Sequence, residues 1–184
     1  MRYFFHFLAF AMLLSFHICV GQSNPAEKVP LKTFKKLYKI NDSIYRSEQP
    51  SRKGFQLLEE KGLVSILNLR RLKDDNGKAK KTDLTLIHIR LKTKAIDEDE
   101  ILQVLKAIKN AKKPLLIHCW HGSDRTGITT AAYRIVFENW TKEAAIAEFR
   151  KPEFGYHEKW YPHLVTLLEN LDVARFRKEL GIQE

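Results

Sequence analysis

The sequence LLIHCWHGSDRT occupies residues 115–126 and joins two predicted elements of secondary structure. The apolar run at residues 115–117, introduced by Pro114, predicts a buried strand. A helix is predicted from about residue 126 to residue 138, so residues 118–125 form a loop between a strand and a helix. Backbone N–H groups in such a loop converge with those at the start of the helix, and together they favour binding of an anion.

The side chains of this loop suit a phosphate group. Cys119 stands at the start of the loop, where the N–H donors and Arg125 favour the thiolate over the thiol. A thiolate is a nucleophile at neutral pH, and the planar guanidinium of Arg125 matches two oxygens of a phosphate. Gly122 removes a side chain where the backbone must turn sharply. A lone cysteine is more often a small buried hydrophobe, but this joint spacing favours a chemical role.

Predicted strands and helices alternate along the rest of the chain. This alternation predicts an α/β fold with a central, largely parallel sheet flanked by helices. Its ligand site is expected at the carboxyl ends of the strands. Residues 74–77, DDNG, are interpreted as an exposed turn within a charged loop. The remaining predicted strands cover residues 44–46, 63–69 and 84–91. The remaining predicted helices cover residues 51–61 and 164–180, with one more opening at residues 97–100 and another capped by Thr141.

The N-terminal segment differs from the rest of the chain. Arg2 is the only formally charged side chain before Glu27, and residues 3–20 are mostly apolar. These features predict a secretory signal peptide over residues 1–21, cleaved after Gly21. The protein is therefore expected to be secreted or periplasmic. An uncleaved membrane anchor is the alternative, and only in that case is the membrane a partner.

The mature chain is predicted to contain one domain. Residues 22–36 are polar and basic, contain two prolines and are interpreted as a linker. Residues 37–184 then form a single domain, which is long enough to bury a core. Removal of the signal peptide would also remove Cys19, leaving Cys119 without a partner for an internal disulfide.

The formal net charge is +10. A basic surface attracts anions, although scattered lysines on a solvated surface explain the same charge. Because no nucleic-acid-binding motif accompanies the lysines, no nucleic-acid partner is expected. The histidines show no spacing typical of metal ligands, so no metal site is predicted. No feature of the sequence defines an oligomeric state.

The loop also matches a known pattern: His-Cys, five residues, Arg, then Ser or Thr. His118-Cys119, residues 120–124 and Arg125-Thr126 fit this pattern. The chain therefore resembles the protein tyrosine and dual-specificity phosphatase superfamily. Residues 45–50, YRSEQP, and residues 68–70, NLR, are similar to segments of its compact bacterial and fungal–plant members. The similarity extends over roughly residues 40–150.

The resemblance implies a cysteine-dependent phosphomonoesterase that needs neither metal nor organic cofactor. Cys119 would attack phosphorus and form a cysteinyl-phosphate, while Arg125 would bind the phosphoryl oxygens. The Thr126 hydroxyl would hydrogen-bond the sulfur, and His118 would orient the loop. The phosphate-binding residues implied in this way are Trp120, His121, Gly122, Ser123, Asp124 and Thr126.

The resemblance further implies an aspartate that protonates the leaving oxygen. Asp97 is the first candidate, because it precedes the helix before the catalytic strand, although it also suits the N-cap of that helix. Asp99 and Glu98 are nearby substitutes. Asp124 is another candidate, because similar loops in some phosphoinositide phosphatases carry an aspartate at this point. Its alternative role is to brace the loop or Arg125.

The substrate is predicted less directly. Residues 120–124 contain no Lys or Arg, which disfavours highly anionic substrates and favours a phosphorylated protein, especially phosphotyrosine, or a small phosphomonoester. Trp120 could stack on an aromatic ring or pack beneath the loop. An inositol (pyro)phosphate is the alternative substrate, because the YRSEQP resemblance reaches that branch. Other classes are a non-catalytic phosphate-binding module, a rhodanese-like sulfurtransferase and a basic nucleic-acid binder.

Overall fold

The computed structural model describes residues 24–182, so the predicted signal peptide lies outside the described residues. Six strands form one sheet in the order β1-β2-β3-β6-β4-β5. The four strands β3, β6, β4 and β5 are parallel, and β1 and β2 extend the sheet in antiparallel pairing. The strands are β1 (Glu27–Lys28), β2 (Tyr38–Lys39), β3 (Ile44–Ser47), β4 (Ser65–Asn68), β5 (Thr85–His88) and β6 (Leu115–His118). The predicted α/β fold with a largely parallel sheet is confirmed.

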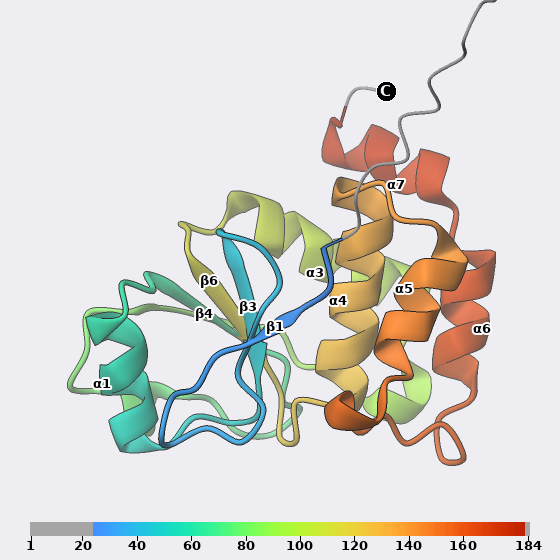
Figure 1. Cartoon of the computed structure of the whole chain (residues 1–184). Coiled ribbons are helices and arrows are strands. Elements are labelled where there is room, and N and C mark those ends of the chain that lie inside the picture. Colours follow the sequence, from blue (N-terminus) through green and yellow to red (C-terminus); the bar gives the residue numbers. More distant parts are fainter. Residues whose placement is uncertain (1–23, 183–184) are drawn as a thin grey trace, which may run out of the picture.

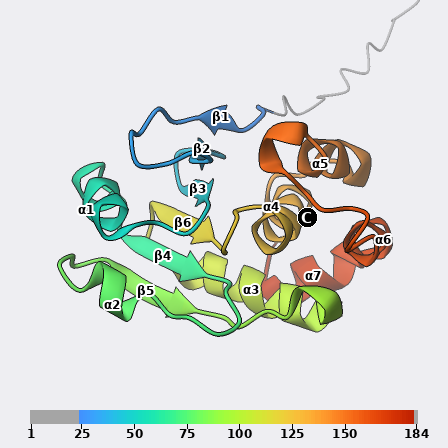
Figure 2. The ribbon, with the colours of Figure 1, turned by 90° about the horizontal axis from the view of Figure 1, so that it is seen from below.

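Helices cover both faces of the sheet (Figures 1 and 2). Alternate residues of a strand point to opposite faces, so Leu115 and Ile117 join one core cluster while Leu116 joins another. The larger cluster lies between the sheet and α3–α7, and the smaller one lies beneath α1 and α2. The helices are α1 (Arg52–Glu60), α2 (Asn76–Ala79), α3 (Glu98–Asn110), α4 (Asp124–Phe137), α5 (Lys142–Phe149), α6 (His163–Asn170) and α7 (Val173–Leu180), with 3-10 turns η1 (Thr93–Ala95) and η2 (Pro152–Phe154).

The register of the parallel strands brings three separate sequence segments to one edge of the sheet. Ser47 at the end of β3 pairs with His118 at the end of β6, and His118 is also level with Asn68 at the end of β4. The loops that follow these strands therefore start side by side. This explains why the YRSEQP and NLR segments accompany the cysteine loop in the sequence.

Two predicted elements differ from the structure. The predicted helix over residues 164–180 is divided into α6 and α7, because the backbone of Leu171 is not helical and the side chain of Asp172 accepts a hydrogen bond from the N–H of Arg175 at 2.9 Å. The predicted exposed turn at residues 74–77 is wrong at Asp75, which is buried; Asp74, Asn76 and Gly77 are exposed, and α2 begins at Asn76.

The described part of the predicted linker, residues 24–36, packs against the domain. β1 pairs with β2, and the N–H of Ala26 donates to Glu148 Oε1 at 2.9 Å. The N–H of Val29 donates to the carbonyl oxygen of Leu37 at 2.9 Å. Because these bonds tie the segment to the sheet and to α5, residues 24–36 belong to the folded unit.

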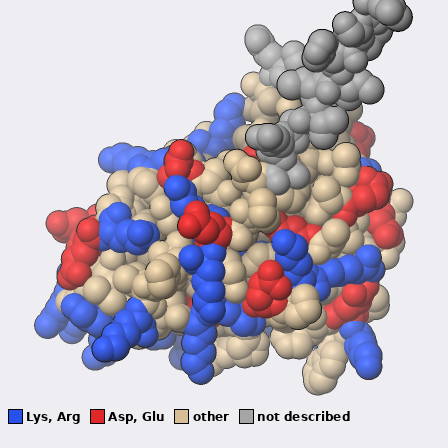
Figure 3. Space-filling view, viewed as in Figure 1, with Lys and Arg blue, Asp and Glu red and all other residues tan. Residues whose placement is uncertain are grey.

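The surface carries charges of both signs. On the face viewed in Figure 1, Lys and Arg side chains are interspersed with acidic side chains (Figure 3). Among residues 24–182, no helix combines the length and apolar character that a membrane span requires.

Candidate active site

The loop between β6 and α4 lies at the carboxyl edge of the parallel strands, as the sequence predicts. Cys119 follows directly after β6 and is 2% exposed. Arg125 stands in the first turn of α4, where its Nη1 donates to the carbonyl oxygen of Leu69 at 3.4 Å. Cys119 thus stands at the start of the loop, and the loop leads into the N-terminus of a long helix. The N–H groups at a helix N-terminus stabilise negative charge.

Gly122 allows the loop to approach the chain beyond β3. Its φ angle is +69°, which L side chains rarely adopt. A Cβ atom there would lie 2.6 Å from the Ser47 carbonyl carbon and 2.6 Å from the Glu48 nitrogen. The N–H of Gln49 donates to the carbonyl oxygen of Trp120 at 3.1 Å. The loop is therefore held backbone to backbone by the YRSEQP segment.

Arg46 braces the same loop from below. This side chain is 1% exposed, and its Nη2 donates to the carbonyl oxygen of Gly122 at 2.8 Å. Its Nη1 donates to Thr130 Oγ1 at 3.2 Å, and its guanidinium lies 4.1 Å from the ring centre of Phe154. Burial lowers the pKa of Arg46 to about 10. No role is predicted for Arg46 from the sequence, in which its position within YRSEQP is the only signal.

His118 is fixed by a buried aspartate. Its Nε2 lies 2.8 Å from Asp75 Oδ2, and its Nδ1 lies 3.1 Å from the carbonyl oxygen of Cys119. Gln49 Nε2 donates to Asp75 Oδ1 at 2.8 Å. Burial alone would raise the pKa of Asp75, but the hydrogen bonds from His118 and Gln49 lower it. These contacts support the loop-orienting role predicted for His118 and add Asp75, for which the sequence predicts no such role.

Trp120 stands on the surface of the loop. Its side chain is 52% exposed, so it does not pack beneath the loop. The guanidinium of Arg70 lies 4.3 Å from the ring centre of Trp120, in cation–π contact, and also donates to Gln49 Oε1. Arg70 thereby links the exposed ring to the buried network around His118.

Thr126 and Ser123 complete the loop. The Thr126 hydroxyl is buried and has no hydrogen-bond partner among residues 24–182. Buried hydroxyl groups are normally paired, so this one is free to bind a ligand or the thiolate. Ser123 Oγ accepts a hydrogen bond from Lys36 Nζ at 3.1 Å, which connects the loop to the segment before β2.

Arg125 lines two neighbouring cavities. One, of about 370 Å³, is bounded by Thr93, Trp120, His121, Asp124, Arg125, His157, Trp160 and Tyr161. The other, of about 220 Å³, is bounded by Arg71, Leu91, Lys92, Thr93, Lys94, Arg125 and Tyr161. Their common residues are Thr93, Arg125 and Tyr161. The first has aromatic walls and the second has cationic walls.

The candidate acids lie in different surroundings. Asp97 is exposed, accepts a hydrogen bond from the N–H of Glu100 at 2.9 Å as the N-cap of α3, and lines neither cavity. Asp99 and Glu98 are both paired with Arg175 of α7. The structure thus shows the capping role of Asp97, and its catalytic role stays a prediction.

Asp124 does line the aromatic cavity beside Arg125. Its Oδ1 accepts the backbone N–H of His157 at 2.9 Å, and His157 Nδ1 lies 3.0 Å from Oδ2. The carboxylate therefore ties α4 to the loop before α6.

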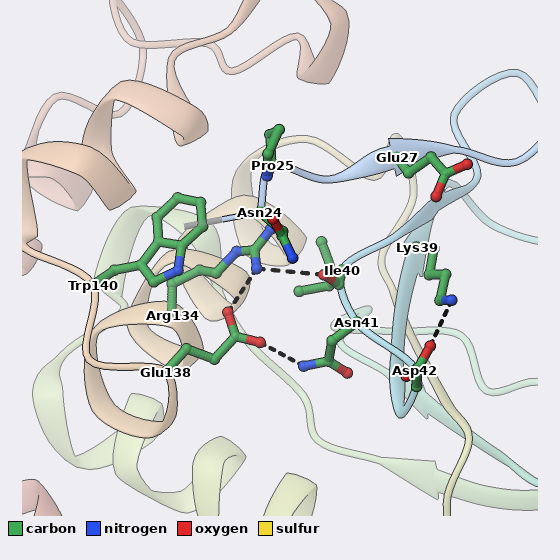
Figure 4. Close-up of a pocket in the computed structure, with 10 residues that line it drawn as sticks. All are labelled: Asn24, Pro25, Glu27, Lys39, Ile40, Asn41, Asp42, Arg134, Glu138 and Trp140. Atoms are coloured by element: carbon green, nitrogen blue, oxygen red, sulfur yellow. Dashed lines mark hydrogen bonds and ion pairs between the residues drawn. The ribbon is translucent and has the colours of Figure 1, made fainter. Parts of the chain in front are cut away.

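A further cavity of about 320 Å³ lies near the other end of α4 (Figure 4). Arg134 there is paired with Glu138 at 2.6 Å and with Glu148 at 2.9 Å, and Lys39 is paired with Asp42 at 2.6 Å. No predicted site residue lines it. Because both cations are held in ion pairs with carboxylates, we assign this cavity a structural role.

Comparisons with known proteins agree with this geometry. The sequence model of the tyrosine phosphatase family matches residues 29–176. The chain is 32% identical over 125 residues to the dual specificity protein phosphatase TpbA of Pseudomonas aeruginosa; the match covers 65% of this chain and 55% of TpbA, so it spans only about half of that relative. It is 29% identical over 154 residues to the inositol diphosphatase DSP5 of Arabidopsis thaliana, covering 76% and 71% of the two chains. A crystal structure of P. aeruginosa TpbA in complex with pTyr superposes with a TM-score of 0.75 at 26% identity, covering 86% and 96% of the two chains.

Proposed function

Because this chain belongs to the tyrosine phosphatase family, we propose that it is a cysteine-dependent phosphatase acting on phosphomonoesters. The observation that carries the proposal is the joint placement of buried Cys119 and Arg125 on one loop at the start of α4. The loop is held in shape by Arg46 and Gln49, which bind its carbonyl oxygens. Its N–H groups are therefore left to face an anion.

The reaction follows from this geometry in two steps. In the first, the sulfur of Cys119 bonds to phosphorus as the bond to the leaving oxygen breaks, and the leaving oxygen takes up a proton. Arg125 and the loop N–H groups stabilise the equatorial oxygens of the transition state. In the second, water attacks phosphorus, the S–P bond breaks, and the Thr126 hydroxyl is available to stabilise the departing thiolate.

The walls of the aromatic cavity favour an aryl phosphate such as phosphotyrosine. Trp120 is 52% exposed and Trp160 is 74% exposed, and both line this cavity together with Tyr161. Exposed aromatic side chains around a phosphate site offer an apolar surface to the ring of the substrate. The similarity to TpbA, whose structure contains pTyr, supports the same substrate class.

An inositol (pyro)phosphate is a second candidate substrate, which the cationic cavity favours. Arg71, Lys92 and Lys94 surround a space that shares Arg125 with the aromatic cavity. Several cations beside one phosphate site suit a substrate with more than one phosphate group. The similarity to an inositol diphosphatase also supports this candidate. Phosphopeptides and inositol phosphates assayed side by side distinguish the two.

Hydrolysis of para-nitrophenyl phosphate by the purified protein, without added metal, tests the proposed activity. We expect Cys119→Ser to abolish turnover, and Arg125→Lys to reduce it strongly because a point charge cannot replace the planar fork. Full activity of Cys119→Ser would refute the mechanism. Phosphopeptide binding without phosphate release would instead indicate a non-catalytic module, and thiocyanate formation from thiosulfate would indicate a sulfurtransferase.

We also propose that residues 1–21 direct export of the protein to a secreted or periplasmic location. The apolar N-terminal segment supports this proposal. The mass of the mature protein isolated from the producing cells is the test. A chain beginning near residue 22 is expected, and an intact N-terminus in the membrane fraction would favour the anchor.

A further inference from the structure

The leaving oxygen in the first step needs a proton donor close to Arg125. Among the described residues that line the two cavities at Arg125, Asp124 is the only carboxylate, and His121 and His157 are the only imidazoles. Asp97 lines neither cavity. Because carboxyl and imidazole groups titrate closer to neutral pH than phenol or ammonium groups, the proton donor is sought among Asp124, His121 and His157.

Asp124 acts as a hydrogen-bond acceptor in this structure. Its two carboxylate oxygens lie 3.1 Å and 3.0 Å from Nδ1 of His157, and Oδ1 also accepts the backbone N–H of His157. The Asp124 side chain is 13% exposed. Both oxygens are thus occupied by His157, which leaves this carboxylate poorly placed to give a proton to a substrate.

His157 is oriented by the same contacts. With Nδ1 bound to Asp124, Nε2 has no hydrogen-bond partner among residues 24–182. The His157 side chain is 46% exposed and lines the cavity beside Arg125. A carboxylate that binds one nitrogen of an imidazole fixes its orientation and stabilises its charged form, which prepares the other nitrogen for proton transfer.

His121 is the weaker candidate. Its ring centre lies 6.1 Å from that of His157, and its side chain has no carboxylate partner among the described residues. Burial lowers the pKa of His121, the electrostatic effect of His157 acts in the same direction, and Asp124 opposes both.

We propose that His157, held by Asp124, donates the proton to the leaving oxygen. This proposal rests on the phosphatase function proposed above. As the sulfur of Cys119 bonds to phosphorus and the P–O bond breaks, the proton on Nε2 passes to the leaving oxygen. In the second step Nε2 takes a proton from the attacking water as the S–P bond breaks, which restores the thiolate and the charged imidazole. The titratable and charged groups that line cavities with His157 are Lys35, Lys36, Glu48, His121, Asp124, Arg125 and Tyr161.

Two esters with different leaving groups test this role. Phenyl phosphate releases a basic phenolate that needs a proton, whereas difluoromethylumbelliferyl phosphate releases a weakly basic anion that needs little help. We expect His157→Gln to lower kcat/KM about 100-fold for phenyl phosphate and much less for the activated ester. The basic limb of its pH profile for phenyl phosphate should also disappear. Activity on the activated ester shows that the variant is folded.

The controls separate this role from others. Glu158→Gln changes the neighbouring residue, which pairs with Arg150 on the surface, and is expected to leave both activities unchanged. The proposal is overturned if His157→Gln lowers kcat/KM equally for both esters or for neither. It is also overturned if His121→Gln or Asp97→Asn, and not His157→Gln, shows the loss that depends on the leaving group. Wild-type protein that hydrolyses neither ester would reject the phosphatase function itself, which Cys119→Ser tests separately.

Discussion

Replacing Gly122 by alanine tests whether close backbone contact with residues 47–49 holds the phosphate loop in shape. The φ angle of Gly122 is +69°, and an added Cβ would meet three backbone atoms: Ser47 carbonyl carbon at 2.6 Å, Ser47 oxygen at 2.7 Å and Glu48 nitrogen at 2.6 Å. Backbone atoms cannot rotate aside as a side chain does, so the loop itself must move.

Gly62 provides a matched control for the size of the destabilisation expected in Gly122→Ala. Its φ angle is +90°, and an added Cβ would meet no atom within 4 Å. Gly62→Ala therefore carries only the conformational cost of an L residue in the left-handed region, about 1–2 kcal/mol. Gly122→Ala carries that cost and an overpacking cost of about 1–3 kcal/mol in addition. Since 1 kcal/mol shifts the melting temperature by about 2–4 °C for a domain of this size, the two variants are distinguishable.

Thermal unfolding measures the loss of stability in these variants, and steady-state kinetics measures the loss of activity. Displacement of the loop would weaken the contacts of Gly122 with Arg46 and of Trp120 with Gln49. A shift of about 1 Å in a catalytic loop costs about 100-fold in rate, so Gly122→Ala is expected to lose activity and to bind vanadate weakly. Gly62→Ala should keep both. Wild-type kcat/KM in Gly122→Ala, with a melting temperature equal to that of Gly62→Ala, would refute the reasoning.

Three further outcomes are expected. Asp75→Asn removes the charged partner of buried His118 and should lower kcat/KM equally for activated and unactivated esters. Burial opposes ionisation of Asp75, but the hydrogen bonds from His118 and Gln49 lower its pKa. The ionised carboxylate therefore stabilises the fold above its unfolded pKa near 4, and this contribution is lost as pH falls below that value. Urea unfolding of wild type and Asp75→Asn between pH 3 and 6 measures the difference. Glu148→Gln weakens the buried pair with Arg134 and should cost about 3 kcal/mol in chemical denaturation; a loss under 1 kcal/mol would contradict this.

The strand, the loop and the following helix could be predicted because their signals are local. Cys119, Gly122 and Arg125 lie within one short stretch, and the backbone geometry between a buried strand and a helix brings their polar groups together. Alternation of apolar strands and amphipathic helices likewise predicted the largely parallel sheet, because both patterns are properties of single segments. The family resemblance gave each of these residues a role.

The contact between Asp75 and His118, which holds the start of the loop, could not be predicted in the same way. Asp75 stands in an acidic stretch that is typical of an exposed turn, and only the tertiary position of His118 makes its burial favourable. An aspartate that is buried must be paired, and the pairing partner lies 43 residues away. The split between α6 and α7 was missed for a related reason, since the capping contact of Asp172 competes with a continuous helix pattern.

For the proton donor, local sequence signals and long-range contacts in the structure favour different residues. Asp97 has two local signals, a position before a helix and a carboxylate, and the structure uses both in the N-cap of α3. Asp124 and His157 lie 33 residues apart and share no pattern, yet the packing of the loop before α6 against α4 joins them beside Arg125. A residue that serves as a helix cap cannot also turn toward the substrate without losing that bond. A group already placed in the cavity and oriented by a carboxylate needs no such change, and this favours His157 over Asp97 as the donor.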